Sequence, residues 1–187
     1  EYTDIDIDQR TIDTQAHNSY MSYIPSLFLN YKASDKSTIR LQYARRIRRP
    51  NVNDLNPFII YRDEFNVSSG NPTLAPVKSD SLELQFGSEI GSFDANLRAF
   101  LRRESDLITE RRYFISDTVL LTTRENAGEN RSGGLEFQLN GKLLPNLSLN
   151  ASGTLLRTEQ ENFRVTGAAR DQSATSLNLR AVLRYQP

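Results

Sequence analysis

Arginine is the residue type in this chain whose placement suggests chemistry. Several arginines recur at alternate positions in segments of alternating polar and apolar residues, which puts them on one side of an extended chain. Arginines outnumber acids on that polar side. The bases there are Arg40, Arg46, Arg48, Arg98, Arg102, Arg180 and Arg184, and the acids are Glu83, Asp94 and Glu136. Such a side would attract an anionic ligand or pair with carboxylates of another domain, and the spacing leaves both readings open.

A second group of arginines lies in polar stretches between the alternating segments. These are Arg49, Arg111, Arg112 and Arg124, which together with Arg46 and Arg48 are the candidate contacts for an anionic ligand. A guanidinium group presents a planar fork of donors that suits carboxylate or catecholate oxygens. The alternative is that these side chains hold lipid phosphates or pair with neighbouring acids, such as Glu110 and Asp117.

No arrangement of residues predicts catalysis, a metal site or a cofactor. His17 is the single histidine. Because a metal site needs several converging ligands, we expect a surface histidine. Asp4, Asp6 and Asp8 lack the glycine and terminal glutamate of a calcium loop and predict a solvated strand face. The chain has no cysteine and no G-x-S-x-G element, so we expect no enzyme. Basic and acidic residues number 23 each, so no net field selects nucleic acid.

The elements that position these arginines are predicted to be β-strands. Apolar and polar residues alternate with period 2 along most of the chain, and no stretch shows helical spacing with a capping residue. Eight strands are expected, near residues 3–8, 23–31, 39–48, 81–86, 93–102, 135–140, 147–155 and 176–185. The predicted fold class is therefore all-β, an antiparallel up-and-down meander.

The connections between these strands alternate between short and long. Short turns are expected at residues 33–36, 91–92 and 144–146, and long loops at about 11–19, 49–76, 105–132 and 159–173. Outer-membrane barrels show this rhythm, with tight periplasmic turns and longer extracellular loops. Tyr31, Phe93 and Tyr185 then lie near the periplasmic ends, where an aromatic girdle is expected. The apolar residues of 107–121 further predict that the third loop is a hairpin with its turn near Ser116 and Asp117.

Low average hydropathy does not oppose this interpretation. Hydrophobic residues make up 37% of the chain, and the mean hydropathy is −0.55. No apolar run approaches the ~20 residues that a transmembrane helix needs. A membrane barrel alternates lipid-facing and lumen-facing residues, so its average hydropathy is low.

The stretch from residue 43 to residue 80 resembles the outer-membrane β-barrel family of TonB-dependent receptors. The elements are RRI-x-RP at 45–50, DLNPF at 54–58, GNP-x-L-x-P at 70–76 and SDS-x-E-L at 79–84. IPSLFLNY at 24–31 and NRSGGLEFQLNG at 130–141 resemble further strands of the family. The family-motif residues of the long loop region are Arg45, Pro50, Asp54, Asn56, Pro57, Phe58, Gly70, Asn71, Pro72 and Pro76. Recurrent proline and apolar side chains predict an ordered, folded-back loop. This loop either contacts cargo or only packs over the barrel mouth for stability.

This resemblance implies transport across the outer membrane of a Gram-negative bacterium. Such receptors import a scarce nutrient, often a ferric siderophore, through a plugged barrel of 22 strands with energy relayed by the TonB complex. The expected partners are therefore outer-membrane lipid, a plug domain, the TonB complex and a small-molecule cargo. We interpret both ends of the chain as cuts through such a barrel, whose open edges would favour self-association. Two alternatives remain at this point, a soluble all-β binding or adhesion module and a small complete eight-stranded barrel.

Overall fold

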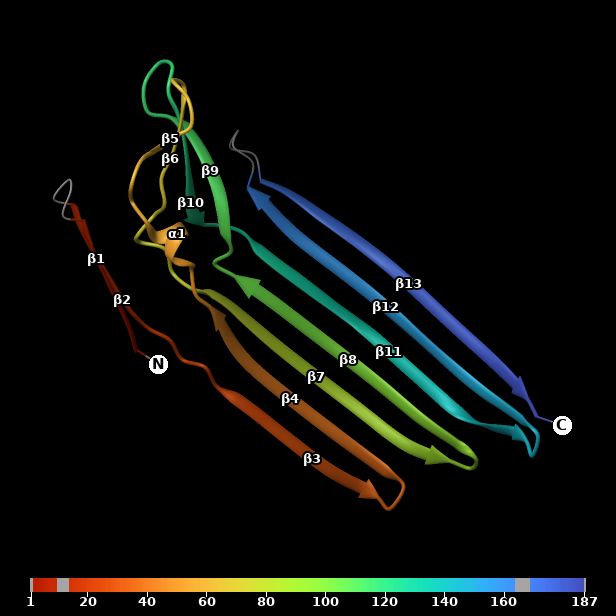
Figure 1. Ribbon diagram of the computed structural model, residues 1–187. Coiled ribbons are helices and arrows are strands. Elements are labelled where there is room, and N and C mark those ends of the chain that lie inside the picture. Colours follow the sequence, from red (N-terminus) through yellow and green to blue (C-terminus); the bar gives the residue numbers. More distant parts are fainter. Residues whose placement is uncertain (1, 10–13, 164–168, 187) are drawn as a thin grey trace.

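A computed structural model describes residues 2–9, 14–163 and 169–186, and most of these residues lie in antiparallel strands. The largest element is a seven-stranded sheet with the order β13-β12-β11-β8-β7-β4-β3. Its strands are β3 (Ser26–Ser34), β4 (Ser37–Arg48), β7 (Val77–Ile90), β8 (Phe93–Ser105), β11 (Glu129–Leu144), β12 (Leu147–Phe163) and β13 (Ala169–Tyr185). Neighbours in space follow one another along the chain (Figure 1), so the predicted up-and-down meander is confirmed.

The register of this sheet aligns apolar residues into rows that cross all seven strands. One row consists of Leu29, Leu41, Leu84, Ala99, Leu135, Leu155 and Leu177. The leucines on the two edge strands are 51% and 65% exposed, and many other large apolar side chains of the same face are exposed as well. An apolar patch of this extent on a folded protein marks a surface that meets lipid or another apolar partner. The rows therefore argue against the soluble-module alternative.

The opposite face of the sheet carries polar rows, as the alternation predicted. Arg40, Gln85, Arg98, Glu136 and Thr154 are successive partners across five strands. A single sheet with one apolar and one polar face has no second layer. The buried apolar residues among those described accordingly gather mainly in the loop region and at the adjoining start of β7, with Leu55, Val67, Leu74 and Val77.

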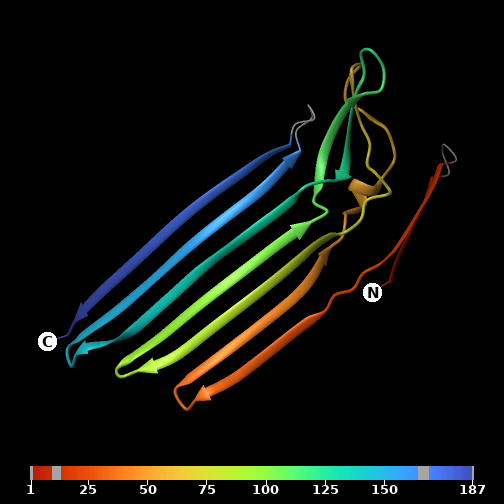
Figure 2. The same cartoon turned by 180° about the vertical axis from the view of Figure 1, so that it is seen from behind.

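Short turns join the strand pairs at one end of the sheet, and all the long connections leave from the other end (Figures 1 and 2). These two ends are called here the turn end and the loop end. At the turn end, β7 passes into β8 through Gly91, whose φ of 63° is readily adopted by glycine alone. The turns lie where the sequence predicted them.

Three of the expected long loops are wrong in their boundaries. Residues 14–19 belong to β2 (Thr14–Met21), which pairs with β1 (Tyr2–Gln9), while residues 11–13 lie outside the described residues. Residues 159–163 and 169–173 extend β12 and β13, and residues 164–168 lie outside the described residues. Residues 129–132 likewise belong to β11. Strands pair through backbone hydrogen bonds, so polar side chains that are typical of loops do not prevent strand pairing.

The first predicted strand is not part of the large sheet. β1 pairs with β2 in a separate two-stranded sheet, so seven of the eight expected strands form the meander. Within the described residues β13 pairs only with β12, and the sheet does not close on itself. The small complete barrel is therefore wrong, and the edges β3 and β13 are left unpaired. Self-association through these edges stays a prediction.

The single helix among the described residues is the one-turn α1 (Val52–Leu55). No helix in the described part of the chain has the length and apolar character needed to cross a membrane.

Candidate functional site

A small module rises from the loop end of the sheet (Figure 1). Its four-stranded sheet has the order β5-β6-β10-β9, with β5 (Ile60–Tyr61), β6 (Asn66–Ser68), β9 (Ile108–Phe114) and β10 (Leu120–Asn126). β9 and β10 form an antiparallel hairpin in which Leu120 lies opposite Phe114. The hairpin and the position of its turn, between residues 114 and 120, agree with the sequence prediction. We call this sheet together with residues 49–76 the loop module.

Residues 49–76 fold back on themselves through main-chain contacts. The Gly70 N–H donates to the Asn56 carbonyl at 2.7 Å, and the Asn71 N–H donates to the Asp54 carbonyl at 2.6 Å. A Cβ at position 70 would lie 2.5 Å from the Asn56 oxygen and 2.6 Å from the Asp54 oxygen. The close approach of these two segments therefore requires glycine, which explains the glycine of the GNP element.

Asparagine side chains hold this folded-back loop to the hairpin. The Asn71 amide donates to the Arg124 carbonyl at 3.0 Å. Asn126 accepts from the Ala75 N–H at 2.8 Å and donates to the carbonyls of Ala75 and Asp106 at 2.9 and 2.8 Å. Because these partners are backbone groups, the amides act as extra strand pairing between the two segments.

The motif residues of the loop thus have local structural partners. Asn51 caps α1 by accepting from the Asp54 N–H at 3.0 Å. The Phe58 N–H donates to Asn56 Oδ1, and the Pro57 carbonyl accepts from the Ser69 hydroxyl. Pro50, Asp54, Asn56, Pro57, Phe58, Gly70, Asn71 and Pro72 are half-buried, and Pro76 is buried.

Two motif elements that are far apart in sequence meet at the loop end of the large sheet. The Arg45 guanidinium donates to both oxygens of Asp80, at 2.8 and 3.1 Å, and the Tyr43 hydroxyl donates to the same carboxylate at 2.6 Å. Arg45 and Asp80 are direct register partners on β4 and β7. The RRI-x-RP and SDS elements therefore form one bidentate, charge-assisted contact.

The candidate ligand-binding arginines fall into two groups. Arg111, Arg112 and Arg124 lie in the hairpin and pair with Glu125, Glu110 and Asp54 at 2.7, 2.6 and 3.6 Å. Arg46 and Arg48 lie near the end of β4, with Arg49 directly after it, and all three side chains are exposed.

A cavity of about 560 Å³ brings part of the first group together with the motif loop. Arg111 and Arg124 line it with Gly70, Asn71 and Pro72. Tyr113 also lines it and holds the Arg111 guanidinium 5.3 Å from its ring centroid. Arg112 is not among the lining residues, although it lies next to Arg111 in the sequence. The cavity offers guanidinium donors and an aromatic ring, and a carboxylate that a ligand would have to displace from a guanidinium group. This combination suits a small anionic or polar ligand.

Sequence reasoning missed a cluster on the polar face of the large sheet. Phe100 is only 7% exposed, and the guanidinium carbons of Arg98 and Arg102 lie 5.5 and 5.3 Å from its ring centroid. Arg98 pairs with Glu136 at 2.8 Å and with Glu83 at 3.4 Å, and Arg102 pairs with Glu83 at 3.3 Å. These arginines thus pair within the sheet, which neither sequence hypothesis had considered.

A glycine signals this cluster in the sequence. Gly134 is the register partner of Phe100, and a Cβ there would lie 3.0 Å from the ring. A glycine inside a strand leaves room for a large neighbouring side chain to fold over it.

A third arrangement lies on the β1–β2 hairpin. His17 Nδ1 is 2.8 Å from an Asp6 oxygen and 3.5 Å from an Asp4 oxygen. The hydrogen bond with Asp6, followed by the charge of Asp4, raises the pKa of His17 above its ordinary value. Ligand atoms of these three exposed residues lie within 4.8 Å of one another. Sequence reasoning had treated the histidine and the aspartates separately, because it placed His17 in a loop.

The comparison with known families decides the class of this barrel segment. The model of the outer membrane protein beta-barrel family matches residues 1–186. The chain belongs to this family. The assignment from the motifs to an outer-membrane β-barrel family is therefore confirmed, and the apolar face of the large sheet is the side that meets lipid in an outer-membrane barrel.

Solved structures of larger proteins contain the same fold. The siderophore receptor PirA from Pseudomonas aeruginosa is 17% identical with a TM-score of 0.57, and the match covers 89% of this chain and 35% of PirA. The FrpB iron transporter from Neisseria meningitidis (F3-3 variant) is 13% identical with a TM-score of 0.57, and the match covers 83% of this chain and 22% of FrpB. At these identities the likeness shows the fold alone. No curated protein matches the chain significantly.

The chain therefore corresponds to an unclosed portion of a larger barrel and spans less than half of either neighbour. Both neighbours are named for receptor or transport roles.

Proposed function

We propose that this chain is a barrel segment of a TonB-dependent receptor that imports a scarce nutrient, such as a ferric siderophore, across the outer membrane of a Gram-negative bacterium. The observation that carries the proposal is the loop module, which places a cavity lined by Arg111 and Arg124 above one end of a lipid-facing sheet. Under this proposal the loop end is extracellular and the turn end periplasmic.

The polar face would then line the lumen and meet a plug domain. Glu83 and Glu136 are already neutralised by Arg98 and Arg102. Arg40, Arg180 and Arg184 form no side-chain ion pair among the described residues, so they keep donors for plug carboxylates or for cargo in transit. Energy coupling would come from the TonB complex acting on the plug, outside this chain.

Cargo contact is proposed for the cavity arginines and for the exposed group Arg46, Arg48 and Arg49. In the cavity an anionic cargo competes with Glu125 for Arg111 and with Asp54 for Arg124. The Arg124 pair is the longer, at 3.6 Å, and its guanidinium is the easier of the two to recruit. Arg112 keeps its partner Glu110 outside the cavity and serves as the matched control.

The test uses the full-length receptor that contains this segment. Arg111→Gln with Arg124→Gln is expected to weaken binding of ferric catecholate siderophores about 5- to 30-fold at low salt, at roughly 0.5–1 kcal/mol for each exposed charge contact. The loss should shrink at high salt, because screening weakens exposed pairs. Arg112→Gln should stay within about twofold of wild type. Equal losses in both variants, or none in either, would remove the cavity from the binding site.

Energy coupling is tested separately by uptake of the radiolabelled ferric siderophore in cells with and without TonB. Uptake should require TonB. Undiminished uptake in cells that lack TonB would refute the proposed class of receptor, whatever the binding variants show.

A further inference from the structure

A row of charged side chains crosses five strands on the lipid-facing side of the large sheet. Successive register partners are Arg45, Asp80, Arg103, Arg131 and Glu159. The next row toward the turn end contains Tyr43, Leu82, Leu101, Gly133 and Arg157. Residues two apart on a strand share a face, so the charged row lies directly beside the apolar rows, on the side of the loop end.

The ion pairs of Arg103, Arg131 and Arg157 leave guanidinium donors unused. Arg103 Nη2 lies 2.6 Å from a Glu129 oxygen, and Arg131 contacts the other oxygen of the same carboxylate. One acid therefore serves two guanidinium groups. Arg157 pairs with Glu159 at 2.7 Å. Arg103, Arg131 and Arg157 remain 58%, 64% and 64% exposed, and each guanidinium has five N–H donors.

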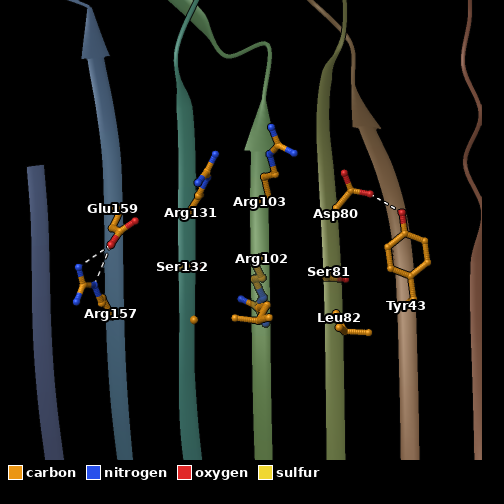
Figure 3. A pocket seen from close by; sticks show the side chains of 12 residues that line it. Tyr43, Asp80, Ser81, Leu82, Arg102, Arg103, Arg131, Ser132, Arg157 and Glu159 are labelled. Atoms are coloured by element: carbon orange, nitrogen blue, oxygen red, sulfur yellow. Dashed lines mark hydrogen bonds and ion pairs between the residues drawn. The ribbon is translucent and has the colours of Figure 1, made fainter. Parts of the chain in front are cut away.

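These side chains surround a hollow of about 560 Å³ on the lipid-facing side. Leu82, Leu101 and Gly133 line its part toward the apolar rows. Arg103 and Arg131 line its part toward the loop end, and Arg157 borders it at the level of Leu82 (Figure 3). Gly133 keeps the hollow open, because a Cβ there would lie 2.7 Å from a Leu101 methyl group. The hollow thus joins an apolar floor to a cationic rim.

An amphipathic ligand fits this combination. Arginines that border an apolar band face the boundary between acyl chains and headgroups, where anionic groups attract them. The guanidinium fork matches phosphate oxygens in a bidentate manner. A free anion would use the rim but not the apolar floor.

We propose that this hollow binds the phosphorylated headgroup of a membrane lipid, with phosphate on Arg103, Arg131 and Arg157 and an acyl chain along the apolar rows. The choice of the outer leaflet, and hence of a phosphorylated glycolipid, rests on the orientation in the proposed function. The site is separate from the cargo cavity, because the two share no lining residue.

The experiment measures binding of lipid A to the full-length receptor in neutral detergent, with fully dephosphorylated lipid A and inorganic phosphate as the other arms. Arg131→Gln with Arg157→Gln is expected to lower lipid A affinity about 25-fold, or about fivefold for each arginine. Arg112→Gln is the matched control, since Arg112 pairs with an acid two residues away on an exposed strand just as Arg157 does. It should change the affinity less than twofold.

Two further variants separate binding from misfolding. Arg131→Lys with Arg157→Lys keeps the charge but loses the bidentate fork, so its affinity should lie between those of wild type and the Gln variant, whereas Glu159→Gln should raise the affinity several-fold because Glu159 competes with phosphate for Arg157. Dephosphorylated lipid A should bind at least 25-fold more weakly than lipid A. The proposal is overturned if the Gln variant binds lipid A like wild type, if Glu159→Gln weakens binding, or if inorganic phosphate binds as tightly as lipid A. No arm uses cargo or TonB, so failure here is distinct from failure of the proposed function.

Discussion

Replacing Gly70 by alanine should open the loop module without unfolding the barrel segment. The added methyl group would meet the Asn56 oxygen at 2.5 Å, and real Cβ contacts essentially never fall below 3.0 Å, so the two segments must separate by at least about 0.5 Å, the difference of these values. All three of the nearest atoms are backbone atoms, which do not swing aside as a flexible side chain would. Gly70 is not among the positive-φ glycines, so the penalty comes from the close approach and not from backbone strain.

The magnitude follows from the two main-chain hydrogen bonds at this point, Gly70 to Asn56 and Asn71 to Asp54. Each contributes a net ~0.5–1.5 kcal/mol, so the free energy of local opening should fall by about 1–3 kcal/mol. At about 1.4 kcal/mol for each factor of ten, the amide hydrogens of residues 50–76 should exchange roughly 5- to 150-fold faster.

Hydrogen exchange followed by mass spectrometry on the full-length receptor gives the measurement. Gly91→Ala is the matched control, because Gly91 has a φ of 63° and open space around its Cβ. That variant should cost about 1–2 kcal/mol at the turn end and leave residues 50–76 unchanged. Wild-type protection of residues 50–76 in Gly70→Ala, or faster exchange over the whole sheet, would refute the argument.

Two other predictions concern single side chains. Asn126→Ala removes three hydrogen bonds to backbone groups of Ala75 and Asp106, so it should lower the free energy of local opening, measured by hydrogen exchange, by about 2–4 kcal/mol. Asn126→Asp keeps the acceptor for the Ala75 N–H but turns a carboxylate oxygen toward the two carbonyl oxygens, so it should lose at least as much, and a smaller loss in Asn126→Asp than in Asn126→Ala would contradict this account. The pKa of His17 is raised by Asp6 and Asp4, so the β1–β2 hairpin should gain stability below the ordinary histidine value of about 6.5 and lose it as pH rises through the higher folded value. An NMR titration of the His17 ring, whose signal is assigned by its loss in His17→Gln, reports this directly, and Asp6→Asn should lower the observed pKa; an unchanged titration would rule out the Asp6 contact.

Much of the fold could be predicted because the alternation of residues along a membrane strand shows which side chains lie on the apolar face and which on the polar face. Leu135, Phe137 and Leu139 alternate with polar residues, and a one-residue slip would turn all of them to the polar side, so the alternation predicts both strand and face. Gly91 and Pro145 lie in short connections, which makes neighbouring strands antiparallel. The family, by contrast, was predicted from the resemblance of the motifs at residues 45–84 to those of known outer-membrane barrels, and not from the alternation.

The limits of the strands were not predictable in the same way. Residues 14–19 and 159–163 carry polar side chains that are typical of loops, yet they pair as strands. Their pairing depends on a neighbouring backbone of matching length, which no local window of sequence contains.

The sequence by itself determined which residue types lie on each face of the sheet, because side-chain direction in a strand depends only on parity along the chain. Only the tertiary structure decided which of those residues meet. Arg45 meets Asp80, and Phe100 lies over Gly134, because the register brings together residues 35 and 34 positions apart. The same register puts Arg103 and Arg131 beside the apolar rows, and the folded-back loop puts Gly70 against Asn56. These contacts depend on cumulative strand pairing across the whole sheet and on the close packing of a long loop, and neither is written in any single segment.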